Sequence, residues 1–119
     1  MRFILIPLLF VFSFAWTQTI NESDFEEKIN EDIVVVEFYA EWNKDNCVEL
    51  SNFKNVATYM VNIEDSPTLT KTYKIYSVPT IIIFYNQEVV EKYEADLTFQ
   101  LCIKDATRKV EELVLSKFR

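Results

Sequence analysis

The sequence predicts a single α/β domain in which helices flank a central mixed β-sheet. The chain has 119 residues, and 50% of them are hydrophobic, which is enough for one core and too few for two. Behind an apolar N-terminal segment, the periodicities follow the order helix, strand, helix, strand, helix, strand, strand, helix. This order implies that the strands form the centre of the domain and that helices cover the sheet.

The first sixteen residues have the layout of a secretory signal peptide. Arg2 precedes an apolar run over residues 3–12, and the small residues Ser13 and Ala15 have the spacing of a signal-peptidase site. We expect export and cleavage near residues 16–18, which leaves a domain over residues 17–119. An uncleaved N-terminal anchor is the alternative, although the apolar run is short for a membrane span.

The first helix and the first strand follow directly. A cluster of N-cap residues at 21–24 precedes Phe25 and Ile29, and the spacing of four between these two predicts a short helix over residues 23–30. Residues 33–39 are apolar apart from one glutamate and predict a buried strand.

The next two elements are a second helix and a second strand. Cys47, Leu50 and Phe53 have helical spacing, which predicts a helix over residues 45–53. Apolar residues between 56 and 63 then predict a strand.

The remaining elements are a brief helix over residues 68–73, a hairpin and a long helix. The hairpin joins strands over residues 80–85 and 89–93 through Asn86-Gln87. Apolar residues with a period of 3.6 predict a final helix over residues 99–118.

Composition excludes several classes of function. The chain contains no histidine, so histidine-based acid–base chemistry and histidine metal sites are absent, and two cysteines alone make a poor zinc site. It contains no glycine, which excludes glycine-rich phosphate loops. The net charge of −7 and the lack of a basic cluster argue against nucleic-acid binding. We therefore expect no metal, no cofactor and no nucleic-acid partner.

Two segments resemble the thioredoxin family. The first is Val36-Glu37-Phe38-Tyr39-Ala40-Glu41-Trp42, which is similar to the strand of that family with its buried acid and its active-site tryptophan. The second is Val78-Pro79-Thr80 with the apolar run that follows, which resembles the family's cis-proline loop. The likeness covers residues 23–117, and it implies the thioredoxin fold.

The chain departs from the family at the active site. Asn43-Lys44-Asp45-Asn46 stands where the family has Cys-x-x-Cys. Disulfide exchange requires a thiolate nucleophile and a resolving thiol, and asparagine supplies neither. The segment between Trp42 and Asn62 is also shorter than in typical members, which implies a shortened helix after the motif. A lysine that often neighbours the buried acid aligns with Met60.

Cys47 is the remaining candidate thiol. In the first turn of a helix its thiolate would be favoured by the helix dipole, and Lys44 is close in sequence. We favour a small packed residue instead, because free cysteine usually packs as a small apolar side chain. Cys102, on the apolar stripe of the last predicted helix, has the same interpretation. A Cys47–Cys102 disulfide is a third alternative, and its test is the distance between the two residues.

The resemblance also defines a candidate binding face. It implies a cis bond before Pro79 and an apolar groove formed by Trp42, Val78, Pro79 and Thr80, in which the backbone of Val78 pairs with an extended peptide. Glu37 would be a buried acid whose pKa is raised by burial, or one that finds a water or hydroxyl partner.

The hypothesis from the sequence is therefore an exported, secreted or periplasmic, thioredoxin-like domain. We expect it to bind a peptide or protein partner as a monomer, without dithiol catalysis and away from the membrane after cleavage. The alternative is an enzyme, a monothiol redox protein that uses Cys47.

Overall fold

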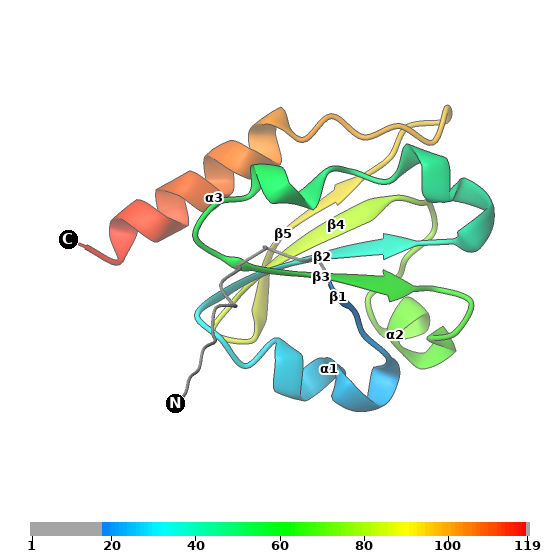
Figure 1. Cartoon of the computed structure of the whole chain (residues 1–119), viewed down its shortest axis with the longest axis horizontal. Helices are drawn as coiled ribbons and strands as arrows, with labels where there is room; N and C mark the ends of the chain where they lie inside the picture. The colour runs from blue at the N-terminus through cyan, green and yellow to red at the C-terminus, as the bar shows by residue number, and fades with distance from the viewer. Residues whose placement is uncertain (1–17, 119) are drawn as a thin grey trace, which may run out of the picture.

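The structure is a computed structural model that describes residues 18–118. A five-stranded mixed sheet with the order β1-β3-β2-β4-β5 lies between two layers of helical segments (Figure 1). Strands β1, β3 and β2 run parallel, whereas β2, β4 and β5 run antiparallel. The elements in chain order are β1 (Gln18–Thr19), α1 (Glu22–Lys28), β2 (Ile33–Tyr39), η1 (Glu41–Asn46), η2 (Leu50–Asn52), β3 (Ala57–Asn62), α2 (Pro67–Thr72), β4 (Thr80–Tyr85), β5 (Glu88–Glu94) and α3 (Lys104–Ser116). The predicted fold class is confirmed.

The N-terminal segment predicted to be a signal peptide, residues 1–16, lies outside the described residues. Between residues 18 and 118, no helix is long and apolar enough to cross a membrane.

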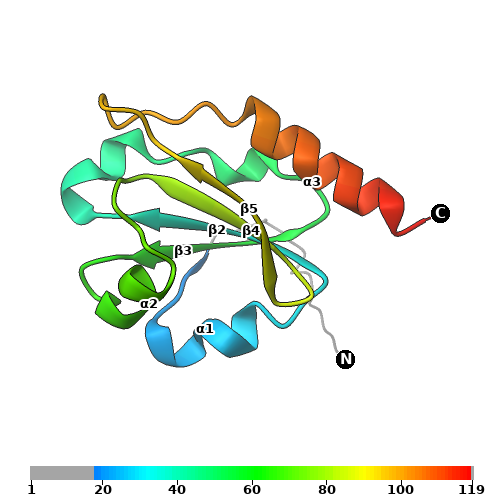
Figure 2. The same ribbon diagram turned by 180° about the vertical axis from the view of Figure 1, so that it is seen from behind.

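Strand β2 is the centre of the sheet and is buried along its whole length. Its alternating side chains supply two hydrophobic cores, one on each face. The core under α1 and α2 contains Ile20, Phe25, Ile29, Val34, Val36, Phe38, Val61, Ile75, Ile82 and Phe84. The core on the other face contains Ile33, Val35, Leu50, Phe53, Ile81, Ile83, Ala106 and Val110. Figures 1 and 2 show α1 and α2 on one side of the sheet, with α3 and the segment that contains η1 and η2 on the other.

Most predicted elements are present within one or two residues of their expected bounds. The cap of α1 is Asn21, whose Oδ1 accepts a hydrogen bond from the Asp24 N–H at 3.0 Å. The β4–β5 turn places Asn86 and Gln87 at φ values of 53° and 71°, the left-handed conformation that a tight hairpin requires. Strand β1, only two residues long, was not predicted because so short a segment has no periodicity to detect.

The helix predicted over residues 45–53 is wrong. Two short 3-10 segments, η1 and η2, are joined there by an extended stretch that begins at Cys47. The chain must return along β2 to reach the start of the parallel strand β3, about 20 Å for seven residues. Within the extended stretch the Val48 N–H donates a hydrogen bond to Glu37 Oε2 at 2.7 Å, which holds the segment against the sheet. The shortening after the motif is therefore greater than the sequence analysis expected.

The last helix begins later than predicted. Helix α3 starts at Lys104, so Phe99 and Cys102 lie in the loop that joins β5 to α3. Asp96 competes with helix formation there, because its Oδ1 accepts hydrogen bonds from the N–H groups of Thr98 and Gln100. The prediction that Cys102 lies on the buried stripe of the helix is wrong, since its side chain is exposed.

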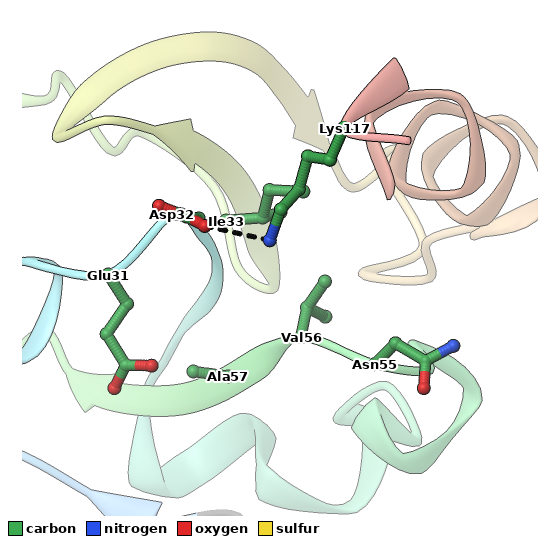
Figure 3. A pocket seen from close by; sticks show the side chains of 7 residues that line it. All are labelled: Glu31, Asp32, Ile33, Asn55, Val56, Ala57 and Lys117. Atoms are coloured by element: carbon green, nitrogen blue, oxygen red, sulfur yellow. Dashed lines mark ion pairs between the residues drawn. The ribbon is translucent and has the colours of Figure 1, made fainter. Parts of the chain in front are cut away.

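A hollow of about 440 Å³ lies at the end of the sheet where β2 and β3 begin. Figure 3 shows Lys117, which follows α3, reaching across this hollow to Asp32. The Nζ and Oδ2 atoms of this ion pair are 2.8 Å apart. The thioredoxin-like motif follows the end of β2, so this hollow lies at the opposite end of the strand from it.

Candidate functional site

The two asparagines at the motif positions form a hydrogen-bonded link to the proline loop. Asn43 is buried, and its Nδ2 donates a hydrogen bond to the carbonyl oxygen of Val78 at 3.0 Å. Asn46 Nδ2 in turn donates to Asn43 Oδ1 at 2.9 Å. The side chain that replaces the first motif cysteine therefore connects η1 to the loop before β4, which is 35 residues away in sequence.

The Val78–Pro79 peptide bond is cis, as the resemblance implied. The loop closes on itself through Thr80, whose Oγ1 donates a hydrogen bond to the Ser77 carbonyl at 2.7 Å. It is also tied to the end of β5, because the Ala95 N–H donates to the Pro79 carbonyl at 3.1 Å. Val78, Pro79 and Thr80 are all buried.

The two backbone groups of Val78 have different surroundings. The sequence analysis expected its backbone groups to serve a peptide, whereas the carbonyl already accepts the amide of Asn43. Among residues 18–118, none accepts a hydrogen bond from the Val78 N–H. The Val78 N–H is therefore an available donor, and the carbonyl oxygen keeps a second lone pair beside the one that accepts from Asn43.

Trp42 is the exposed member of the predicted groove. Its side chain is 62% exposed and packs edge-to-face on Phe99, with ring centroids 5.2 Å apart. Phe99 is itself 41% exposed. The predicted motif residues Lys44 and Asp45 are exposed on the same turn, and Lys44 Nζ lies 3.8 Å from Glu41 Oε2.

Glu37 is completely buried on the face of β2 that packs against the η1–η2 segment. Its Oε2 accepts a hydrogen bond from the Val48 N–H at 2.7 Å. Burial raises the pKa of Glu37 to about 7, against the opposing hydrogen bonds from Val48 and the Cys47 thiol. Sulfur is a weak donor, and Oε1 has no hydrogen-bond partner among the described residues. On the adjacent strand the residue in register is Met60, so no lysine neighbours this carboxyl there.

Cys47 lies in a setting that disfavours a thiolate. It follows η1 in an extended conformation and so lacks the helix first turn on which the dipole argument depended. Burial and the neighbouring Glu37 carboxyl raise the pKa of the Cys47 thiol to about 12. Cys47 and Cys102 are free thiols, so the structure contains no disulfide between them.

The site therefore brings together Trp42, Asn43 and Asn46 of η1 with Val78 and Pro79 from the loop before β4. Cys47 and Glu37 contact each other beneath this face. Sequence reasoning missed the Asn43–Val78 hydrogen bond and the position of Phe99. The signal for Phe99 was the Asp96-Leu97-Thr98 sequence, which is typical of a side-chain-capped turn. Among the described residues, no group of three metal-ligating side chains lies together.

A model of the family described as Thioredoxin matches residues 16–106. The chain belongs to the thioredoxin family. Over 83 residues it is 28% identical to a thioredoxin of Chlamydia trachomatis serovar D, which covers 63% of this chain and 80% of that protein. A thioredoxin of Buchnera aphidicola is 29% identical over 83 residues, covering 60% of this chain and 75% of that protein.

Solved structures show the same fold. A mutant thioredoxin from Halobacterium salinarum superposes with a TM-score of 0.64 at 18% identity, covering 82% of this chain and 88% of that one. A designed protein gives a TM-score of 0.67 at 22% identity, covering 82% of this chain and 97% of the designed chain. These likenesses concern the fold, and the chemistry must be argued from the residues of this chain.

Proposed function

We propose that this member of the thioredoxin family is exported and binds a peptide or protein partner through the face formed by Trp42 and the Val78–Pro79 loop, without dithiol redox catalysis. The observation that carries the proposal is the pair of asparagines at the motif positions. Asn43 and Asn46 have no sulfur, and their amides are engaged in holding the motif turn to the Val78 carbonyl. In place of a thiol pair, the motif positions hold two amides that link the motif turn to the loop before β4 by hydrogen bonds.

Two groups on this face, the Trp42 side chain and the Val78 N–H, support the proposed binding mode. Trp42 presents a large aromatic side chain to solvent, and exposed aromatic residues are enriched in protein interfaces. The Val78 N–H has no acceptor among the described residues and is a donor for the backbone of an extended segment. Binding as a monomer needs no second copy of this chain.

The monothiol alternative is not favoured by the surroundings of Cys47. A pKa of about 12 leaves almost no thiolate at neutral pH, and the thiolate is the reactive form. Neither a metal nor a cofactor is needed for the proposed binding.

Insulin reduction with dithiothreitol tests the loss of redox function. We expect the wild type and the Cys47→Ser variant to show no catalysis. In the same Cys47→Ser background, the double change Asn43→Cys and Asn46→Cys is expected to produce dithiol activity, since Trp42 and the cis Val78–Pro79 loop beside these positions are retained. Catalysis by the wild type that disappears in Cys47→Ser would contradict the proposal and favour the monothiol enzyme.

Partner capture from the host tests the binding function. Immobilised wild-type protein is expected to retain the same partner with or without reductant, and Trp42→Ala is expected to lose it. Retention by Trp42→Ala equal to that of the wild type would place the binding surface elsewhere. Mass spectrometry of the protein recovered from host secretions tests export, with an N-terminus expected near Gln18. Recovery of the intact chain from the cell alone would contradict export.

A further inference from the structure

We propose that the loop between β5 and α3 adds a second aromatic wall, Phe99, to the Trp42 face, and that this widened face takes an extended segment of a partner protein carrying an aromatic side chain flanked by Lys or Arg. This inference rests on the proposed function and specifies the chemistry of its partner. It concerns the β5–α3 loop, residues 95–103, which the sequence analysis had assigned in part to the last helix.

Two contacts bring this loop to the face, and a third joins the motif turn to the proline loop. The first residue of the β5–α3 loop, Ala95, donates its N–H to the Pro79 carbonyl. Asn43 holds the neighbouring Val78 carbonyl from the motif turn. Phe99 then packs on Trp42, which precedes Asn43. Both ribbon views show the loop running beside η1 (Figures 1 and 2). The aromatic pair is therefore continuous with the proline loop.

Asp96 fixes the conformation of the loop. Its Oδ1 accepts hydrogen bonds from the Thr98 N–H at 2.8 Å, the Thr98 hydroxyl at 2.5 Å and the Gln100 N–H at 3.3 Å. These bonds lower the pKa of Asp96. Phe99 adopts a φ of 63°, which is rare for a bulky residue and requires support from its surroundings. Asp96 is thus a positioning residue that directs the Phe99 ring toward Trp42.

No other part of the described chain covers the exposed faces of Trp42 and Phe99. Trp42 and Phe99 remain 62% and 41% exposed although they contact each other, and Leu97 in the same loop is 97% exposed. An edge-to-face pair leaves ring faces open, on which a third aromatic ring can pack. Two walls of this kind favour an aromatic side chain of the partner over an aliphatic or small one.

The charge around the pair selects the flanking residues of the partner. Glu41 and Asp45 are exposed on the motif turn, and Glu64 lies beside it with its Oε1 at 3.4 Å from the Glu41 N–H. The base on this turn is Lys44, which pairs with Glu41. Carboxylates exceed ammonium groups at this rim, and the whole chain has a net charge of −7. A segment with Lys or Arg complements this surface.

Four labelled peptides test the inference by fluorescence anisotropy with the full-length protein. Each is a decapeptide of Ser and Ala with a central Phe or Ala, flanked by two Lys or by two Gln. We expect the Phe peptide with Lys to bind most tightly, and Phe99→Ala to weaken it about fivefold, the effect of losing one aromatic contact. The Ala-centred peptides are expected to be unaffected by Phe99→Ala. Phe118→Ala, which removes an exposed phenylalanine beyond α3, is the matched control.

Asp96 variants separate positioning from general stability. Asp96→Ala is expected to reduce the preference for Phe over Ala peptides as Phe99→Ala does, whereas Asp96→Asn keeps the Oδ1 acceptor and restores the preference. Phe99→Leu keeps apolar volume in the loop and is expected to lose the preference while the unfolding midpoint in urea stays near that of the wild type.

The outcomes distinguish the two proposals. Binding that is lost in Trp42→Ala but unchanged in Phe99→Ala would overturn the role of Phe99 and leave the proposed function standing. Equal affinity for the Lys and Gln peptides would overturn the charge preference. If the wild-type protein bound none of the four peptides, this inference would be overturned, whereas the proposed function would still be decided by partner capture with the wild type and Trp42→Ala.

Discussion

Replacing Glu37 by glutamine is expected to remove a loss of stability that develops as the pH rises from about 4.5 to about 7. Glu37 is completely buried, and its pKa is raised from 4.5 to about 7 because burial penalises the charged form. In this pH range the folded chain keeps a proton that the unfolded chain releases. Its contribution to stability is therefore greatest below about pH 4.5, falls as the pH rises, and levels off above about pH 7.

The magnitude follows from the size of the pKa difference. A change from 4.5 to about 7 corresponds to a free energy of about 3 kcal/mol at alkaline pH. Glutamine has nearly the same shape, and its amide oxygen can accept the Val48 N–H that Glu37 Oε2 now accepts. Its buried amide NH₂ group has a cost of about 1–3 kcal/mol if unpaired, but this cost does not depend on pH. The pH dependence of the difference between the two proteins is thus the quantity to measure.

Urea unfolding of the wild type and Glu37→Gln at pH 4.5, 5.5, 6.5 and 8 provides the assay. The difference in unfolding free energy, Glu37→Gln minus wild type, is expected to increase by about 3 kcal/mol between pH 4.5 and pH 8. Glu88→Gln, which changes an exposed glutamate of β5, is the control and is expected to show no such gain. A difference between Glu37→Gln and the wild type that stays constant across this range would refute the reasoning, because a carboxyl that ionises in the folded chain as in water contributes no such trend.

Three further results are expected. Asn43→Ala leaves the Val78 carbonyl without its donor and is expected to lower the unfolding free energy by about 1–3 kcal/mol, whereas Asn46→Ala, at an exposed side chain, costs less than about 1 kcal/mol; equal losses in urea unfolding would contradict the link to Val78. In a Cys102→Ser background, iodoacetamide at pH 7.5 is expected to alkylate Cys47 at least about tenfold more slowly than free cysteine, because its raised pKa suppresses the thiolate; a rate equal to that of free cysteine would count against the buried setting. Lys117→Ala breaks a partly exposed ion pair and is expected to lower the unfolding free energy by no more than about 1 kcal/mol. A larger loss would show that the Lys117–Asp32 ion pair contributes more than an exposed ion pair does.

The sequence was most informative where one element decides its own structure. The bounds predicted for the strands over residues 33–39 and 80–85 are those observed for β2 and β4, because buried strands have long apolar runs. The Asn86–Gln87 turn was also predictable, since few residue pairs tolerate left-handed backbone in a hairpin.

The sequence was least informative where helical spacing predicted a helix but a hydrogen bond to a side chain elsewhere favoured another conformation. Cys47, Leu50 and Phe53 have helical spacing, yet this segment must return along β2 and meets the carboxyl of Glu37 on the way. Phe99 continued the period of the last helix, but the side chain of Asp96 binds the local N–H groups first. In each case a hydrogen bond to one side chain outweighs a weak periodic preference.

By itself the sequence determined the strands β2, β3, β4 and β5, the burial of Glu37 and the absence of sulfur from the motif, because each depends on residue type and local pattern. Only the tertiary structure decided that Asn43 reaches Val78 and that Phe99 reaches Trp42. Those contacts join segments 35 and 57 residues apart, and their geometry depends on how every element between them packs.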